Sequence, residues 1–345
     1  MENEFFTPLQ LNLTSEKERQ HLAAFLAQSG LRLDENLQYY VVLCDAQGEI
    51  VCGGGFDNNI IKCVAVSEEA RGLGLVNTLI SHLRSEIANR GADNIFVYTK
   101  PENKQIFESL AFYTVGTSPQ AILLESSKRG IIRLKKRLAK HKKPGLNGAI
   151  VMNANPFTLG HLYLVQEAAK RCDNLYIFPV RADRSDFPYQ DRYRLVKEGC
   201  ASVTNAEILD GGQYIISEAT FPTYFLKQMG QAAQTQAQLV LGIFANHIAP
   251  SLNIRVRFVG SEPLDLFTQT FNKTMLQVLP QHGIKVDVIE RLNSEAQPVS
   301  ASRVRTLLKE GRLAETKTLV PPSTFAYLAT PAGQKVIASL RSHCS

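Results

Sequence analysis

Short apolar runs separated by turn-forming residues make up the first clear pattern in the chain. Residues 39–43, 50–56 and 60–66 are apolar runs, and turn-forming residues stand between them at 45–48 and 57–59. Three such runs with short polar turns predict an antiparallel meander.

A helical pattern follows the meander. Apolar residues recur at three- and four-residue spacing from position 75 to 88, directly after Arg71-Gly-Leu-Gly74, and this spacing predicts an α-helix. Further elements are expected as a strand at 95–98, a helix near 105–110 and a strand around 112–115. Together these segments predict a compact α+β unit.

Basic side chains replace the apolar pattern between residues 126 and 146. This stretch holds nine Lys or Arg and no acid, and it closes with Pro144-Gly145. The simplest interpretation is a solvated helix that connects two folded parts. We therefore expect a domain at 1–127, a basic linker at 128–146 and a second domain at 147–345.

Predicted strands and helices alternate after the linker. Strands are expected at 149–152, 175–180, 208–209, 256–259 and 286–289. Helices are expected around 159–171, 191–198, 267–279 and 302–310, with a long glutamine-rich helix before the fourth strand. This alternation predicts a doubly wound parallel sheet, with ligands at the carboxyl ends of its strands.

Composition narrows the class of protein. The 345 residues are 44% apolar and 20% charged, which excludes a disordered or fibrous chain. The longest uncharged stretch, 228–254, contains five glutamines, so we expect no membrane span. The N-terminus does not resemble a signal peptide, and the six cysteines show no CxxC pair. We expect reduced thiols in a cytoplasmic protein.

The net charge of +6 raises the question of a nucleic-acid or acidic partner. The chain has 38 Lys and Arg against 32 Asp and Glu, and nine of the 38 lie in the acid-free linker. The remainder is therefore slightly acidic, and the excess positive charge belongs to the linker. We expect no nucleic-acid partner, because no aromatic residue interleaves with the basic run, and docking of an acidic partner is the alternative to a merely solvated linker.

Asn155-Pro-Phe-Thr-Leu-Gly-His161 carries the strongest chemical signal, because it follows a predicted strand and opens a helix. Backbone N–H groups at a helix N-terminus suit a phosphate group. Gly160 would allow close approach of the backbone, Thr158 can donate a hydroxyl or cap the helix, and His161 can donate an imidazole N–H to a transition state. The alternative is a capped helix with an incidental histidine.

Val299-Ser-Ala-Ser-Arg-Val-Arg305 stands at a second predicted helix start. The hydroxyls of Ser300 and Ser302 and the guanidinium of Arg305 could hold a polyphosphate. Serine-rich helix starts are also common caps, so this motif alone does not separate the two roles.

The two motifs together resemble the paired signatures of the nucleotidyltransferase superfamily. With Arg257-Phe-Val-Gly-Ser-Glu-Pro263 and Phe271-Asn272, they resemble the citrate lyase ligase family in particular. Members of that family carry an acetyltransferase-like (GNAT) α+β domain before the nucleotidyltransferase domain, so the resemblance covers nearly the whole chain. It implies nucleotide-binding roles for Asn155 and Gly260.

Arg71-Gly-Leu-Gly-Leu-Val76 resembles the pyrophosphate-binding loop of acetyltransferases. Backbone N–H groups of such a loop, here around Arg71 and Gly74, can bind the pyrophosphate of coenzyme A. Val76 stands where the family has Gly or Ala. We expect this domain to hold the carrier's prosthetic group, coenzyme A or no ligand.

The resemblance implies an ATP-dependent ligase. Such enzymes use acetate and ATP to acetylate the thiol of the citrate lyase acyl carrier protein, which belongs to a dephospho-coenzyme-A-derived group, and they release AMP and pyrophosphate. Acetate is ionised at pH 7, so its attack on the α-phosphate needs positioning and charge stabilisation rather than a base. No redox cofactor is expected, and Mg²⁺ is inferred from the polyphosphate, with ligands that the sequence does not identify.

The resemblance also suggests which phosphate groups each motif would bind. Thr158, Gly160 and His161 would hold the α- and β-phosphates. Ser300, Ser302 and Arg305 would hold the departing pyrophosphate. His161, Thr158 and Arg305 are the expected catalytic residues. Arg181, Arg184 and Arg192 are candidates for contact with acetate or phosphate, or they belong to a solvated face.

Two other functions fit parts of the sequence. The first is an adenylyltransferase for a nucleotide or pantetheine phosphate, fused to an acetyl-coenzyme-A-dependent acetyltransferase. It would need a phosphorylated co-substrate, whereas the ligase would need acetate and carrier thiols. The second is a nucleic-acid-binding adaptor that uses the basic run, and its binding would weaken with salt.

Overall fold

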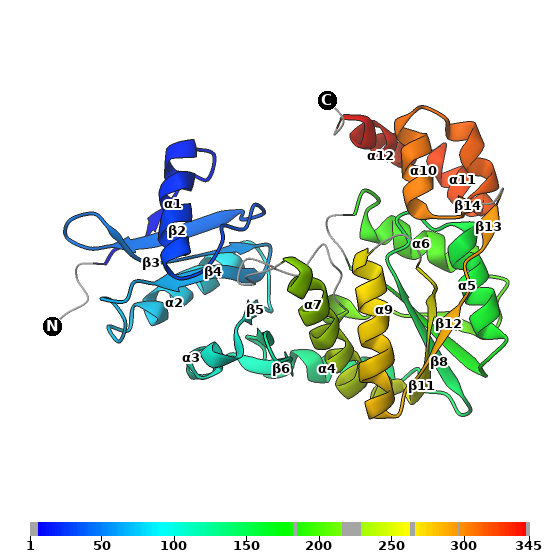
Figure 1. Cartoon of the computed structure of the whole chain (residues 1–345), viewed down its shortest axis with the longest axis horizontal. Coiled ribbons are helices and arrows are strands. Elements are labelled where there is room, and N and C mark those ends of the chain that lie inside the picture. Colours follow the sequence, from blue (N-terminus) through cyan, green and yellow to red (C-terminus); the bar gives the residue numbers. More distant parts are fainter. Residues whose placement is uncertain (1–5, 182–184, 216–228, 263–265, 295–296, 343–345) are drawn as a thin grey trace. The chain divides into compact units, whose positions relative to one another are not determined.

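The computed structural model describes residues 6–181, 185–215, 229–262, 266–294 and 297–342. The chain divides into two compact units, and each is described by itself. The first consists of Met1–Ile132 with Pro222–Leu239, and the second of Arg133–Phe221 with Val240–Ser345. Figure 1 shows the elements of both units and labels many of them.

The first unit is built on a seven-stranded sheet with the order β1-β2-β3-β4-β5-β7-β6. Neighbouring strands are antiparallel except for β4 and β5, which run parallel. The strands are β1 Leu9–Gln10, β2 Tyr39–Cys44, β3 Ile50–Asp57, β4 Ile60–Val66, β5 Phe96–Thr99, β6 Tyr113–Thr117 and β7 Ile122–Glu125. The predicted meander is confirmed as β2, β3 and β4.

Helix α2 (Leu75–Asn89) closes the core of the first unit, because its apolar stripe faces the sheet. Leu79 and Leu83 are fully buried against Val41, Leu43 and Phe56 of the sheet. The other helices of this unit are α1 Glu16–Gln28, η1 Pro101–Asn103 and α3 Lys104–Ser109. The helices predicted at 75–88 and 105–110 are therefore confirmed as α2 and α3.

The basic segment contains helix α4 (Gly130–Ala139), and the boundary between the units falls within this helix, at Ile132 and Arg133. Leu134 and Leu138, one helical turn apart, are 4% and 1% exposed. The segment is therefore helical as expected, but one side of the helix is packed rather than solvated.

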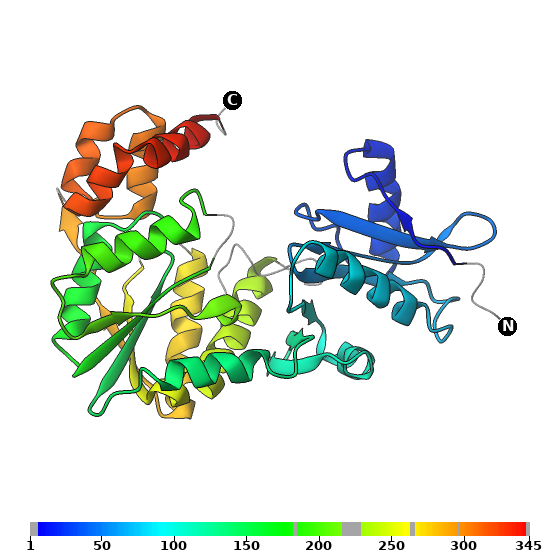
Figure 2. The same ribbon diagram turned by 180° about the vertical axis from the view of Figure 1, so that it is seen from behind.

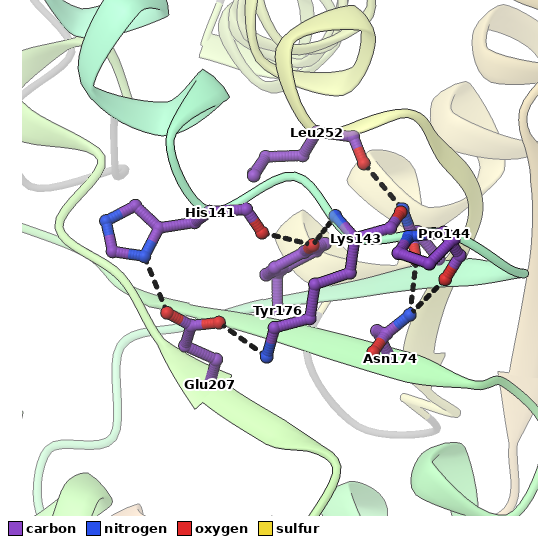
Figure 3. A network of polar contacts seen from close by, with 8 residues as sticks. His141, Lys143, Pro144, Asn174, Tyr176, Glu207 and Leu252 are labelled. Atoms are coloured by element: carbon purple, nitrogen blue, oxygen red, sulfur yellow. Dashed lines mark hydrogen bonds and ion pairs between the residues drawn. The ribbon is translucent and has the colours of Figure 1, made fainter.

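The chain after α4 is tied to the second unit by a network of polar contacts (Figure 3). The hydroxyl of Tyr176 donates to the carbonyl of His141 (2.7 Å) and accepts the Lys143 N–H (3.1 Å). The carboxylate of Glu207 lies 2.6 Å from His141 Nδ1 and 2.9 Å from Lys143 Nζ. Partial burial raises the pKa of Glu207, but Lys143 and His141 hold it below its ordinary value.

A second group of contacts fixes the entry into β8 in the same network (Figure 3). The Asn174 side-chain amide donates to the carbonyl of Pro144 at 2.7 Å. The amide of Asn147 donates to the carbonyls of Lys143 and Leu252 at 2.9 and 2.8 Å. Residues 141–147 are thus part of the second unit.

The second unit is a five-stranded parallel sheet with the order β10-β9-β8-β11-β12. The chain starts in the middle of the sheet and moves outward first in one direction and then in the other, so the predicted doubly wound topology is confirmed. The strands are β8 Asn147–Met152, β9 Asn174–Pro179, β10 Ala206–Ile208, β11 Ile254–Gly260 and β12 Lys285–Ile289. A short hairpin adds β13 Asn293–Ser294 and β14 Gln297–Pro298.

Helices cover both faces of this sheet (Figures 1 and 2). One face carries a core in which Ile177 and Phe258 of the sheet pack with Val165, Leu195 and Val304 of the helices. On the opposite face the Arg257 guanidinium lies 4.7 Å from the centre of the Phe244 ring. The helices of this unit are α5 Leu159–Ala169, α6 Tyr189–Gly199, η2 Gly212–Tyr214, η4 Phe244–Ile248, α8 Ala249–Leu252, α9 Leu266–Val278, η5 Leu279–His282, α10 Ala301–Lys309, η6 Leu313–Thr318, α11 Pro322–Leu328 and α12 Pro331–Ser342. Helix α7 (Met229–Ile243) belongs to the first unit up to Leu239 and to the second unit from Val240.

The register of the parallel strands fixes where a ligand site can form. Met152 of β8 pairs with Pro179 of β9, and Gly260 of β11 pairs with Ile289 of β12. The carboxyl ends of these strands therefore meet at one edge, from which the following loops project. Among the described residues, no helix combines the length and the apolar character needed to cross a bilayer.

Candidate active site

Thr158 is the N-cap of α5, the helix that follows the central strand β8. Its backbone is extended (φ −120°, ψ 169°), and its side-chain oxygen accepts the backbone N–H of His161. The side chain is only 1% exposed. Of the two roles that the sequence left open for its hydroxyl, the structure shows the helix cap.

His161 completes the cap in the reverse direction. Its Nδ1 accepts the backbone N–H of Thr158 at 3.1 Å and lies 2.8 Å from Thr158 Oγ1. A neutral imidazole carries one proton, so an Nδ1 that accepts from the backbone leaves that proton on Nε2. None of the described residues hydrogen-bonds to Nε2, so this N–H can donate to a ligand.

The surroundings of His161 keep it neutral. Burial, followed by the positive charge of Arg291, lowers the pKa of the imidazole from its ordinary value to about 4. The ring also stacks on Phe157, with the ring centres 5.7 Å apart. At pH 7 His161 is therefore an oriented, uncharged hydrogen-bond donor.

Gly160 brings the two motifs together. A Cβ atom added at this position would lie 2.5 Å from the carbonyl oxygen of Val299, which is backbone of the second motif. The start of α5 and the chain before α10 are in contact only because residue 160 has no side chain. Close approach of the Gly160 backbone to phosphate stays a prediction.

Three of the four first N–H groups of α5 are already used by the protein. Those of Thr158 and His161 take part in the reciprocal cap, and that of Leu159 donates to the carbonyl of Leu319 at 2.9 Å. No described residue accepts the fourth, that of Gly160. This helix start therefore offers a ligand the Gly160 N–H together with the helix dipole.

The second motif opens α10 in a similar way. Ser300 is the N-cap, and its hydroxyl accepts the Arg303 N–H at 3.2 Å. Within the described ranges no acceptor binds the N–H groups of Ala301 and Ser302. The start of α10 thus offers two backbone donors, which suits an anion.

Arg305 links the two motifs directly. Its Nη1 donates to the carbonyl of Asn155 at 2.6 Å, and its Nη2 donates to Ser302 Oγ at 3.3 Å. Its Nε lies 3.1 Å from a carboxylate oxygen of Asp186. A guanidinium has five N–H groups, so these contacts leave donors for a ligand.

Asn155 and Asp186 form the other side of this arrangement. The Asn155 side-chain amide donates to Asp186 at 3.0 Å, and its oxygen accepts the Phe187 N–H at 2.9 Å. Asn155 is 8% exposed. Its side chain therefore joins the loop after β8 to the loop after β9, and its predicted role as a nucleotide ligand is untested.

The three arginines near the second strand have different surroundings. Arg192 is fully buried and donates to the carbonyls of Asn153, Val180 and Phe187 at 2.7, 2.8 and 2.9 Å. The solvated-face interpretation is therefore wrong for Arg192, because its guanidinium is committed to the backbone of the loops. Arg181 forms a two-point ion pair with Asp210 at 3.1 and 2.6 Å, and Arg184 lies outside the described residues.

The ends of β11 and β12 add a further charged group to this edge. A Cβ atom added at Gly260 would meet open space, and the Gly260 carbonyl accepts the side-chain amide of Asn272 at 3.2 Å. Arg291, just after β12, donates through Nε to the carbonyl of Ser261 at 2.6 Å and pairs with Glu262. The positive charge of Arg291 contributes, after burial, to the lowered pKa of His161.

Asp186 and Arg291 were missed by the sequence reasoning. Both follow strands of the parallel sheet, β9 and β12, and a search for charged residues after each predicted strand could have found them. No motif of recognisable spacing includes either residue. Their roles depend on partners that lie far away in sequence.

The loop of the first unit that resembles an acetyltransferase loop has the expected backbone form. Gly74 has φ 74° and precedes α2, which begins without a side-chain cap. Arg71 is exposed and lies 3.5 Å from Glu68. Val76 is partly buried and packs against the core of the unit. Ligand binding by Arg71 and Gly74 stays a prediction.

The described residues contain no group of three or more His, Cys, Asp or Glu side chains that could hold a metal ion. A magnesium ion that enters with a nucleotide takes most of its ligands from phosphate oxygens and water. Asp186 is the carboxylate that contacts Arg305.

Solved structures match each part of the chain separately. An acyl-CoA N-acyltransferase from Pseudomonas aeruginosa is 13% identical, covers 35% of this chain and 99% of its own, and has a TM-score of 0.31. Thermotoga maritima TmcAL bound with alpha-thio ATP is 15% identical, covers 55% of this chain and 57% of its own, and has a TM-score of 0.36. The folds of the two units are defined by the strand orders given above.

Sequence comparison covers almost the whole chain. Residues 147–328 match the family model of the citrate lyase ligase C-terminal domain, a range that includes both motifs of the site. The citrate (pro-3S)-lyase ligase of Escherichia coli is 38% identical over 94% of each chain. That of Klebsiella pneumoniae is 36% identical over 92% of this chain and 94% of its own. The chain belongs to the citrate lyase ligase family.

Proposed function

We propose that the protein uses ATP and acetate to acetylate the thiol of the citrate lyase acyl carrier protein, as a citrate (pro-3S)-lyase ligase. The observation that supports this most directly is the junction of the two motifs. Arg305 contacts the Asn155 carbonyl, and Gly160 adjoins the Val299 carbonyl. One edge of the parallel sheet thus gathers the free N–H groups of two helix starts and one guanidinium.

The first half-reaction joins acetate to the α-phosphorus of ATP. A new bond forms between an acetate oxygen and the α-phosphorus, and the bond from that phosphorus to the bridging oxygen breaks, so pyrophosphate leaves. Acetate needs no base, and the protein's part is to orient the phosphates and to stabilise the charge that develops on them. Magnesium bound to the triphosphate would neutralise part of this charge.

We assign the donors to the phosphates by their positions at the two helix starts. The neutral Nε2–H of His161 and the N–H of Gly160 would bind the α- and β-phosphates. The start of α10, with Ser302 and Arg305, would bind the departing pyrophosphate. Thr158 and Asn155 act through their neighbours, because the Thr158 hydroxyl accepts the His161 N–H and the Asn155 amide donates to Asp186.

The second half-reaction transfers the acetyl group. The carrier thiol attacks the acetyl carbonyl carbon, the carbon–oxygen bond to the phosphate breaks, and AMP leaves while the thiol proton passes to solvent.

We place the activity in the cytoplasm, because the described cysteines are free thiols, as expected in a reducing compartment.

Acetate-dependent exchange of labelled pyrophosphate into ATP tests the first half-reaction without the carrier. We expect exchange in the wild type and a loss of about 10²–10³-fold in His161→Ala, the cost of one transition-state donor. His282→Ala is the matched control, because His282 is exposed and precedes β12 at the opposite edge of the sheet. Wild-type protein that exchanges without acetate, or full activity in His161→Ala, would contradict the proposal.

A further inference from the structure

Five of the nine cations of the basic segment lie between residues 136 and 143 and form two groups. The first group attaches the segment to the second unit: Arg137 donates to the Asp210 carbonyl at 2.8 Å, and Lys143 pairs with Glu207 at 2.9 Å. Leu134 and Leu138 are buried on the packed side of α4, so this part of the segment has a fixed place on the second unit.

The second group faces solvent. Lys136, Lys140 and Lys142 are exposed, and no carboxylate among the described residues forms an ion pair with them. Lys136 lies in the last turn of α4, and Lys140 and Lys142 follow directly after the helix ends at Ala139. We call these three lysines the basic strip.

The positive charges of the basic strip repel one another in the free protein. These three like charges lie within seven residues of the chain. The segment 126–146 has no acid that could relieve this repulsion. A bound anion would relieve this repulsion. The strip belongs to the same unit as the two helix starts of the candidate site.

We propose that the basic strip is the docking surface for an acidic surface of the carrier protein, which rests on the proposed function above. The thiol is attached to a whole protein, so recognition of that protein can occur away from the reacting atoms. Three exposed lysines on a fixed support complement a group of exposed carboxylates on a partner protein. Such contacts act mainly on the rate of encounter and weaken with salt.

The test compares two triple charge reversals in the full chain. Lys136→Glu, Lys140→Glu and Lys142→Glu are combined in one variant. Lys197→Glu, Lys317→Glu and Lys335→Glu form the control, because these lysines are also exposed on the second unit and give the same change in net charge. The carrier protein in its thiol form is the substrate, and pyrophosphate exchange without carrier reports on the fold and the adenylation site.

We expect kcat/KM for the carrier at low salt to fall at least tenfold in the strip variant and to change little in the control. Added salt should lower the wild-type value towards that of the strip variant, while exchange stays equal in all three proteins. Equal carrier kinetics in the strip variant and the control would overturn the docking proposal. So would unchanged carrier kinetics with lost binding of single-stranded RNA, which would identify a nucleic-acid surface. An absence of acetate-dependent exchange in the wild type would instead overturn the proposed function.

Discussion

His161 is held in one orientation and one protonation state by the helix to which it belongs. The Thr158 N–H occupies Nδ1, and burial near Arg291 lowers the pKa of the ring to about 4. A neutral imidazole donates a hydrogen bond without transferring a full proton, which suits an oxygen that gains charge but keeps no proton. Arg291 therefore contributes to the site through its effect on His161 as well as through its own charge.

The protonation state of His161 can be measured by nitrogen NMR of labelled histidine. The folded pKa lies below the ordinary value of 6.5, so the ring should stay neutral between pH 7 and about pH 5 and begin to take up a proton near pH 4. The nitrogen shifts should show the proton on Nε2. Titration near pH 6.5, or a proton on Nδ1, would contradict the geometry described for the cap. Arg291→Gln should raise the pKa, because it removes the nearby positive charge.

At the scale of elements, the site depends on the fit between α5 and the chain before α10. Gly160 lies against the Val299 carbonyl, Leu159 donates to the Leu319 carbonyl, and Arg305 reaches the Asn155 carbonyl. These contacts join segments about 140 to 160 residues apart. A small displacement of either helix start would separate the donors for the α-phosphate from those for the pyrophosphate.

Gly160→Ala tests this fit. The new Cβ would stand 2.5 Å from backbone, so one of the two segments must move, and we expect a loss of about 1–3 kcal/mol in the free energy of unfolding. Pyrophosphate exchange should fall with it. Gly242→Ala in α7 is the control, because a Cβ there meets no atom within 4 Å. Urea unfolding and exchange assays measure both effects, and a fully active, fully stable Gly160→Ala would show that the contact is unimportant.

Much of the element pattern could be predicted from the sequence, because alternating apolar runs have few structural solutions. The strand predicted at 60–66 and the helix at 75–88 match β4 and α2 almost residue for residue. Helices α11 and α12 were not predicted. Both begin with a proline, Pro322 and Pro331, which breaks a periodic pattern although proline is favoured in the first turn of a helix.

The candidate site was predictable only where its chemistry lies in one short segment. Thr158, His161 and Ser300 stand at helix starts, and their capping geometry follows from local spacing. The burial of Arg192 could not be predicted, because its partners are carbonyls of loops that only the fold brings together. The same holds for Asp186, because its partner Arg305 lies more than a hundred residues away in the sequence.

At the scale of the whole molecule, the basic segment has a solvent-exposed part and a hydrogen-bonded part. Part of its charge faces solvent as the basic strip, while residues 141–147 are bound to β8, β9 and β10 through Tyr176, Asn174 and Glu207 (Figure 3). The net charge of +6 arises in this segment, because the rest of the chain holds 29 Lys and Arg against 32 Asp and Glu. Hydrogen bonds from side chains of the second unit hold this connection in place.

Tyr176→Phe tests whether the connection contributes to stability. The change removes a fully buried hydroxyl and leaves the His141 carbonyl and the Lys143 N–H without this partner. We expect a loss of about 1–3 kcal/mol in the free energy of unfolding, measured by urea denaturation. Tyr163→Phe in α5 serves as the comparison, because no described residue bonds to that hydroxyl. Equal stability of the two variants would mean that the connection adds nothing to the fold.

Arg305 shows how folding prepares a binding site. Its guanidinium is already held at three points, by Asn155, Ser302 and Asp186, before any nucleotide arrives. An arginine that is ordered only by its ligand loses about 2 kcal/mol of side-chain rotational freedom in that step. Because Arg305 has lost that freedom on folding, the site is preorganised. The cost of ordering this side chain counts against the stability of the fold and not against the affinity for the nucleotide.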